Sequence, residues 1–288
     1  MAETRPTATV AAKPTTSVQA VKKGNSISWL APLICIILGY IIWRFLIGSD
    51  GNFTKPDPNG GFWPNHEGAK TALSRMYLGG IIVPILIGCL LTVITFVIER
   101  FLTVSKATGS GNINEFIRKV QYHLANKNVD AAIAECDKQK GSVGNVMKAG
   151  LRKYKEMITV PELDTEQKVL AIQKEVEEAT ALELPMLEKN LVFLSTIASV
   201  ATLLGLLGTV MGMIRSFRSL GAEGGGGSAA TELAIGISEA LYNTAFGIGT
   251  SALALIMYNV FTTKIDAITY GIDESGFTLT QSFASLYK

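Results

Sequence analysis

The sequence is short of charge. Only 17% of its 288 residues are Asp, Glu, Lys or Arg, whereas soluble globular chains carry about 25%. Four windows are almost free of charge: residues 27–47, 77–98, 191–214 and 233–261. Each is as long as the ~20 residues that a helix needs to cross a ~30 Å hydrocarbon layer. A large water-soluble core is the weaker alternative, because buried helices seldom run this long without a charge.

Cysteine and histidine are also scarce. The three cysteines are Cys35, Cys89 and Cys136, and they form no CxxC pair. The two histidines, His66 and His123, are far apart in the expected topology. This spacing supports neither a disulfide framework nor a zinc site. We therefore expect no metal site, no cofactor and no nucleic-acid partner. An enzyme is the least favoured class, because no set of nucleophile, base and oxyanion donors can be assembled.

These patterns predict an all-α fold. We expect a polytopic membrane protein with four transmembrane helices, a helical cytoplasmic region and long helices that extend from the membrane. The expected segments, in order, are a disordered cytoplasmic tail (1–26), an extra N-terminal span (27–47), a periplasmic loop (48–76), a span (77–98), a cytoplasmic helical region (99–190), a span (191–214), a periplasmic hairpin (215–232), a span (233–261) and a cytoplasmic tail (262–288).

Lysine and arginine are distributed unevenly, and this sets the expected orientation. Of the 26, 14 lie in residues 99–190 and four lie before residue 27, but the two expected outer loops hold only three and two. The positive-inside rule then puts both termini and the region 99–190 in the cytoplasm. A cleaved signal peptide fits the first 47 residues poorly, because the apolar run holds Trp29 and Trp43 and no Ala-x-Ala-like site follows it.

Proline and capping signals divide the cytoplasmic region. Pro161 interrupts the helical pattern, and Asp164 or Thr165 can cap the next helix. From there we expect one long helix that continues into the third span, with Pro185 bending it but not ending it. In the second span, Pro84 is expected to introduce a kink.

Small residues line one face of each of the last two spans. Such faces let helix backbones approach closely in lipid, so the simplest interpretation is a helix contact. The expected packing residues are Ala198, Ala201, Gly205, Gly208 and Gly212 in the third span and Gly236, Ala240 and Gly247 in the fourth.

Polar residues are the exception in these spans. Glu239 is the most unusual, since a charged group at the centre of a bilayer costs about 2.5–3.5 kcal/mol on insertion scales. One interpretation is a charge near the interface that is stabilised by the helix dipole. The other is an ionisable group that faces a bundle interior or an ion path. Thr202 and Thr209 belong to a hydroxyl-rich stripe in the third span, and Thr244 lies five residues after Glu239.

Two long motifs resemble a known family. LSTIASVATLLGLLGTVMGMIRSF and LAIGISEALYNTAFGIGTSALALIMYN are similar to the last two membrane helices of the MotA/TolQ/ExbB proton-channel family, most of all to ExbB and TolQ. The resemblance covers roughly residues 77–259. It implies a homo-oligomer, a pentamer, whose pore encloses an ExbD- or TolR-like single-span partner dimer with a membrane aspartate. It also implies pore-facing threonines at Thr209 and Thr244 and the family glutamate at Glu239.

The sequence departs from the family pattern in four places. Thr202 and Leu253 stand where prolines are usual, Asn243 replaces the first threonine of a Thr-Thr pair, and an extra span and loop, 27–75, precede the usual three spans. We expect a proton pathway formed by Glu239, Thr209, Thr244, Asn243 and Thr202.

The resemblance implies a function. We expect an ExbB-like subunit of a proton-driven motor that serves TonB-dependent outer-membrane transport through a TonB-like protein. A TolQ-like envelope-constriction unit or a motility stator is the alternative. A structural membrane scaffold without ion conduction is a third hypothesis. The four windows hold no second acidic residue besides Glu239, so another chain is expected to supply the proton carrier.

Overall fold

The computed structural model of the chain describes residues 27–57, 61–64, 66–222 and 227–287. The expected tail 1–26 and the glycine-rich tip 223–226 of the expected hairpin lie outside these residues. The elements are α1 (Ile27–Ile41), a π-helical turn η1 (Ile42–Ile47), a 3₁₀ turn η2 (Asp50–Asn52), β1 (Phe53–Lys55), β2 (Glu67–Ala69), α2 (Ala72–Leu78), α3 (Ile82–Thr108), α4 (Ile113–Ala125), α5 (Val129–Gln139), α6 (Ser142–Thr159), α7 (Thr165–Glu188), α8 (Leu191–Ala222) and α9 (Gly227–Leu286).

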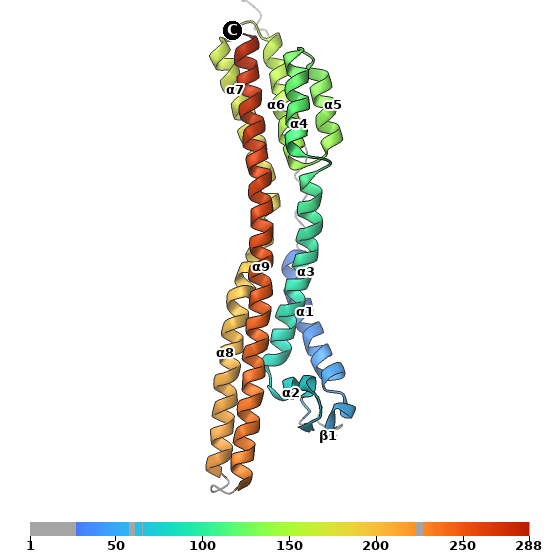
Figure 1. The fold of residues 1–288 in the computed structure, drawn as a ribbon, viewed down its shortest axis with the longest axis vertical. Helices are drawn as coiled ribbons and strands as arrows, with labels where there is room; N and C mark the ends of the chain where they lie inside the picture. The colour runs from blue at the N-terminus through green and yellow to red at the C-terminus, as the bar shows by residue number, and fades with distance from the viewer. Residues whose placement is uncertain (1–26, 58–60, 65, 223–226, 288) are drawn as a thin grey trace, which may run out of the picture.

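The predicted all-α fold is confirmed. Strands β1 and β2 have three residues each and pair antiparallel. Four helical stretches are long and apolar enough to cross a membrane: Trp29–Ile47, Ile82–Ala125, Thr165–Arg218 and Leu233–Leu286. The molecule is a long bundle with α4 to α7 at one end and the small sheet with α2 near the other (Figure 1). We call the segment from α1 to α2, residues 27–78, the N-terminal module.

The second span begins later than expected. Residues 72–78 form the separate helix α2, which begins at a capping box between Thr71 and Ser74. The chain turns at Gly79 and Gly80, where Gly80 has a φ of +81°, and α3 then starts at Ile82. The prediction of a kink at Pro84 is wrong. Pro84 lies in the first turn of α3, where a backbone N–H would have no intrahelical acceptor, so proline breaks no hydrogen bond there.

The long helix expected from residue 165 into the third span is interrupted. α7 ends at Glu188, and Asn190 adopts a left-handed conformation with a φ of +68°. The break is stabilised by Arg100, a side chain only 2% exposed, whose Nη1 donates to the Leu187 carbonyl oxygen at 2.9 Å. The Asn190 amide donates to Glu99 at 3.2 Å. The Arg100 bond satisfies a carbonyl that the end of α7 leaves without an intrahelical partner, and the Asn190–Glu99 bond holds the residue at the break.

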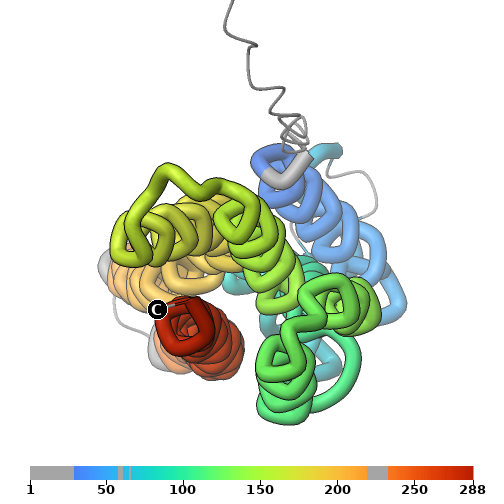
Figure 2. Tube along the Cα trace, turned by 90° about the horizontal axis from the view of Figure 1, so that it is seen from above, coloured from blue at the N-terminus to red at the C-terminus, as the bar shows by residue number. Residues whose placement is uncertain are grey.

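The segment 262–288, expected as a tail, is helical as far as Leu286 and continues the fourth span. One face of this part of α9 is fully buried against the other helices of that end, and it carries Ile265, Ile268, Ile272, Leu279 and Phe283. Seen along the bundle, α4 to α7 form an arc around the C-terminal part of α9, and α1 lies outside the arc (Figure 2). The main hydrophobic core therefore runs along α9 from the apolar spans into the helical end.

Packing along α9 predicts a contrast between two phenylalanines. Phe283 is fully buried and packs edge-on against Tyr154 with 4.8 Å between ring centroids, whereas Phe277 is 68% exposed. We expect Phe283→Ala to lower the free energy of unfolding by about 3–5 kcal/mol. The matched Phe277→Ala should change it by no more than about 0.5 kcal/mol. Denaturant titration of the detergent-solubilised chain measures both, and equal losses would contradict the packing described here.

Candidate functional site

Helices α8 and α9 form a hairpin (Figure 1). Small residues make up their contact surface. A Cβ added to Gly247 would lie 2.5 Å from the Ala201 carbonyl oxygen, and one added to Gly205 would lie 3.2 Å from the Thr244 Cα. The two backbones therefore approach so closely that a larger side chain at these positions has no room. All eight expected packing residues lie at this contact: Ala198, Ala201, Gly205, Gly208 and Gly212 on α8, and Gly236, Ala240 and Gly247 on α9.

Asn243 joins this hairpin to the start of the second span. Its side chain is 3% exposed and fills the space beside Gly208, whose added Cβ would come within 2.6 Å of the Asn243 Cβ. Its Nδ2 donates to the Gly79 carbonyl oxygen at 3.0 Å. Gly79 ends α2, so this carbonyl has no helical partner of its own. Asn243 thus connects α8, α9 and the α2–α3 turn at one point.

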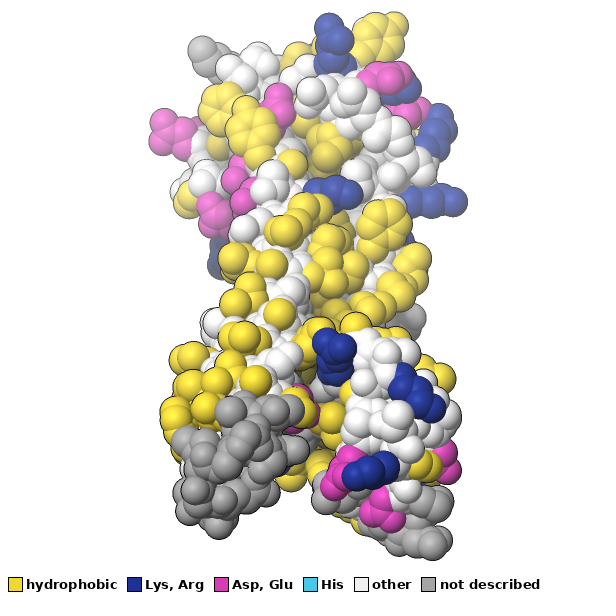
Figure 3. Space-filling view, turned by 60° about the horizontal axis from the view of Figure 1, so that its bottom comes forward, with side chains coloured by type: hydrophobic (Ala, Val, Ile, Leu, Met, Phe, Trp, Pro, Cys, Tyr) yellow, Lys and Arg dark blue, Asp and Glu magenta, His cyan; other side chains and the backbone are white. Residues whose placement is uncertain are grey.

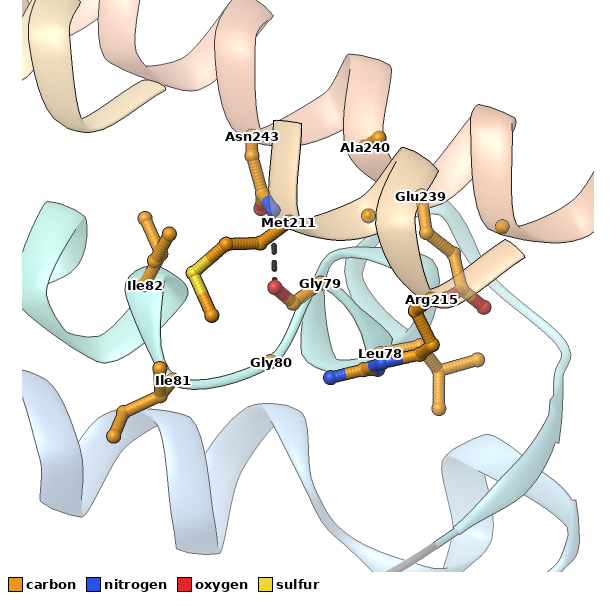
Figure 4. A pocket seen from close by; sticks show the side chains of 12 residues that line it. Leu78, Gly79, Gly80, Ile81, Ile82, Met211, Arg215, Glu239, Ala240 and Asn243 are labelled. Atoms are coloured by element: carbon orange, nitrogen blue, oxygen red, sulfur yellow. Dashed lines mark hydrogen bonds between the residues drawn. The ribbon is translucent and has the colours of Figure 1, made fainter. Parts of the chain in front are cut away.

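Glu239 lies one turn before Asn243 on the same side of α9. The two line a small cavity together with Arg215 and Met211 from α8 and Gly80 from the α2–α3 turn (Figure 4). The cavity has a volume of about 30 Å³, enough for at least one water molecule. Arg215 and Glu239 line it from α8 and α9 respectively.

The hydroxyl groups form a second cluster on another side of α9. The Thr244 hydroxyl donates to the Gly205 carbonyl oxygen at 2.9 Å, and its Oγ1 lies 3.4 Å from the Thr209 Oγ1. The Thr209 hydroxyl itself donates to the Leu206 carbonyl oxygen at 2.6 Å. Thr202 is exposed and bonds back to Ala198 on its own helix at 3.4 Å.

The five residues expected to form one pathway are therefore split within a single chain. Glu239 and Asn243 lie on the same face of α9, because four residues advance a helix by only about 40° beyond one full turn. This face meets the α2–α3 turn. Thr244 follows Asn243 by about 100° and faces α8 and Thr209 instead. Thr202 belongs to neither cluster.

Three residues of the site escaped the sequence analysis. Gly79 and Gly80 were assigned to the second span, and Arg215 to the outer hairpin that was expected at 215–232. The hairpin is shorter than expected, because α8 continues to Ala222 and α9 starts at Gly227. The sequence does hold a signal for Arg215. This basic residue directly follows the window 191–214, and in an antiparallel pair of spans it comes to the same depth as Glu239 in the window 233–261.

Part of the chain, including the candidate site, is similar to a known family. Residues 138–274 match the family model described as the MotA/TolQ/ExbB proton channel family. The resemblance to this family is confirmed. The matched segment contains α8, Glu239 and Asn243 but leaves out the whole N-terminal module, α3 and α4. Its matched helices are those that carry the two polar clusters.

Individual proteins show the same similarity. The chain is 48% identical over 85 residues to a putative biopolymer transport protein, ExbB-like 1, of Synechocystis sp., covering 29% of this chain and 34% of that protein. It is 32% identical over 126 residues to the Tol-Pal system protein TolQ of Pseudomonas aeruginosa, covering 44% and 54%. It is 38% identical over 96 residues to the biopolymer transport protein ExbB of Helicobacter pylori, covering 33% and 64%.

These matches span from about a third to just under two thirds of the curated relatives' own lengths. The relatives carry both ExbB and TolQ names, so they support a proton-channel family and do not single out one transport system. Within the described residues, no group of three or more His, Cys, Asp or Glu side chains is arranged to hold a metal ion.

The close contact of α8 and α9 predicts strong sensitivity at Gly208. Gly208→Ala would push a methyl group into Asn243, and we expect it to lower the thermal stability of the chain. Gly208→Leu should separate the two helices and, in the homo-oligomer that the resemblance implies, disrupt the assembly. Gly249→Ala on α9 is the matched control, because a Cβ there meets nothing within 4 Å and alanine favours a helix by about 0.5–1 kcal/mol over glycine. Thermal melts and native mass spectrometry report both effects. An intact, equally stable Gly208→Leu oligomer would show that this contact is not required.

Proposed function

We propose that the chain is an ExbB-like subunit of a proton-driven motor in the bacterial inner membrane. The observation that carries the proposal is the position of Glu239, a partly buried carboxylate within an apolar span. It lines a water-sized cavity beside Arg215. An ionisable group in such a place marks an ion path by default, because its cost in lipid is high. The motor would couple proton flow to TonB-dependent outer-membrane transport.

A second chain is required to complete the path. Glu239 is the single acidic residue in the four charge-poor windows, and a relay needs at least one further group that binds and releases a proton. The resemblance to ExbB and TolQ supplies a candidate, an ExbD-like single-span partner dimer with a membrane aspartate. A homo-oligomer of this chain, a pentamer by the same resemblance, would enclose the partner, and a TonB-like protein would receive the work.

The exposed faces of α8 and α9 support an assembly of this kind. Large apolar side chains there are open in the single chain, and Leu203, Leu206, Ile248 and Ile256 are 64%, 56%, 52% and 59% exposed. In the proposed ring these faces meet lipid, neighbouring copies and the partner's helices. The Thr209–Thr244 pair then orders water along the path, since hydroxyl groups both donate and accept hydrogen bonds.

Two alternatives remain in the same family, and one outside it. The TolQ relative favours an envelope-constriction unit, and a motility stator would use the same two helices. The genes next to this one discriminate between these roles, because a TonB-like neighbour favours transport. The third alternative is a structural membrane scaffold that conducts no ions. Such a scaffold would not need the charge of Glu239.

The ion-path role predicts the behaviour of three conservative variants. Glu239→Gln keeps the shape and removes the titration, so we expect proton influx to fall about a hundredfold, as expected when a positioned proton-transfer group is lost. Thr209→Val and Thr244→Val each remove one hydrogen-bonding group at similar volume, and each should lower influx about fivefold, equivalent to ~1 kcal/mol. Influx is measured as acidification of spheroplasts after an external acid pulse.

Co-purification of the partner is the control for these variants, since all three should still assemble. Full proton influx and full transport-dependent growth with Glu239→Gln would refute the ion-path role and favour the scaffold.

The proposed orientation has its own test. If both termini are cytoplasmic, the N-terminal module lies outside and α4 to α7 lie inside the cell. Positions 59 and 225 in the expected outer loops lie outside the described residues, so Gly51 and Arg118 are better probes. A membrane-impermeant maleimide should label Gly51→Cys in intact spheroplasts and Arg118→Cys only after permeabilisation. The reverse pattern would invert the topology.

A further inference from the structure

A large cavity lies between the N-terminal module and the α8–α9 hairpin. Its volume is about 680 Å³, and we call it the vestibule. Figure 3 shows it as a cleft between two lobes, with an acidic side chain visible inside. Residues from both lobes line it, among them Trp43, Thr54 and His66 from the module and Arg215, Ile235 and Glu239 from the hairpin.

The vestibule adjoins the water-sized cavity at Glu239. The two spaces share four lining residues: Leu78, Gly80, Arg215 and Glu239. Glu239 therefore stands at the junction between a narrow cavity inside the helix bundle and a wide one that opens beside the module. A carboxylate at such a junction can receive a proton from one side and release it toward the other.

The wall that the module contributes is ordered by aromatic packing. Trp43 stacks on Tyr77 at 4.2 Å between ring centroids, and the Trp43 Nε1 donates to the Tyr77 carbonyl oxygen at 3.3 Å. The Tyr77 hydroxyl donates to the Pro64 carbonyl oxygen at 2.9 Å. Trp43 and Tyr77 are both almost fully buried. These contacts tie η1, α2 and the loop before β2 into one body, so the vestibule has a fixed wall.

Polar groups on this wall suit a water-filled space. His66 is only 1% exposed, and its Nδ1 accepts a hydrogen bond from the Asp57 N–H at 2.8 Å. A neutral imidazole that accepts at Nδ1 carries its proton on Nε2, and this atom has no protein partner among the residues described. That atom is itself buried, so water held in a roomy cavity meets instead the polar side chains of its lining, among them Thr54, Lys55 and Glu67.

We infer that the N-terminal module builds a water-filled access path through which protons from outside the membrane reach Glu239. This role rests on the proposed function. A hydronium in the vestibule gives its proton to the Glu239 carboxylate and remains as water, and the neutral carboxyl later yields the proton to the next acceptor in the assembly. The family match begins at residue 138, so it assigns no role to the module.

Thiol modification inside the vestibule tests the inference in the assembled complex. Ile235 is 44% exposed and lines the vestibule on the hairpin side, and Thr54 lines it on the module side. Spheroplasts that carry Ile235→Cys or Thr54→Cys are treated with impermeant methanethiosulfonates of increasing size. We expect both positions to label and proton influx to fall with reagent size, by about tenfold for the largest, because the path must remain wide enough for water.

Gly51→Cys is the matched control, since Gly51 belongs to the same module, has open space around it and lines neither cavity. It should label equally well and keep its proton influx, as should the parent chain exposed to the same reagents. Two results would overturn the inference: Gly51→Cys labels while both vestibule positions do not, or both vestibule positions label without loss of influx.

A comparison with Glu239→Gln keeps the two proposals distinct. If unlabelled complexes conduct protons in a Glu239-dependent way and labelling the vestibule has no effect, the access path is wrong and the proposed function stands. If Glu239→Gln conducts as well as the parent chain, the proposed function fails, and the access path to Glu239 fails with it.

Discussion

The rest of the structure depends on how closely the backbones of α8 and α9 approach each other. Water cannot drive apolar helices together inside a bilayer, so close packing of small residues has to supply the contact. A Cβ added at any of three glycines would collide with the opposite helix; they are Gly205, Gly208 and Gly247. This approach brings Thr244 within reach of the Gly205 carbonyl and puts Asn243 beside Gly208. Glu239 lies one helical turn before Asn243, at a cavity lined by these two helices and the segment around the α2–α3 turn.

Two buried polar side chains perform the same physical task at two places in the bundle. Asn243 donates to the last carbonyl of the α2 region, and Arg100 donates to a carbonyl near the end of α7. A helix end leaves carbonyl groups without partners, and in lipid each unsatisfied group costs several kcal/mol. Both bonds therefore stabilise a helix break that connects distant parts of the chain. They also link the first half of the chain, outside the family match, to the matched helices.

The sequence predicted what depends on neighbouring residues. Charge-poor windows of sufficient length indicated four spans, and the spacing of Ala198, Ala201 and Gly205 marked a face for close packing. The stripe at Ile265, Ile268 and Ile272 carried the same kind of signal and would have revealed that α9 continues beyond its span.

What escaped prediction depends on residues far apart in the sequence. The break after α7 is stabilised by Arg100, 87 residues before its partner Leu187, and Asn243 bonds Gly79 across 164 residues. No periodicity encodes such pairs. The separation of Glu239 from Thr244 follows from their rotation about α9, but which of them faces the α2–α3 turn is decided by tertiary packing. The vestibule likewise exists only because the module packs beside the hairpin.

The most direct test of this account is the position of the Asn243 side chain in an experimental structure of the assembled complex in a bilayer. The account predicts that its amide nitrogen lies at about 3.0 Å from the Gly79 carbonyl oxygen, with Glu239 and Arg215 lining one cavity that opens beside the N-terminal module. An Asn243 side chain turned toward a neighbouring copy or the partner helices, with Glu239 sealed off from the module, would contradict it.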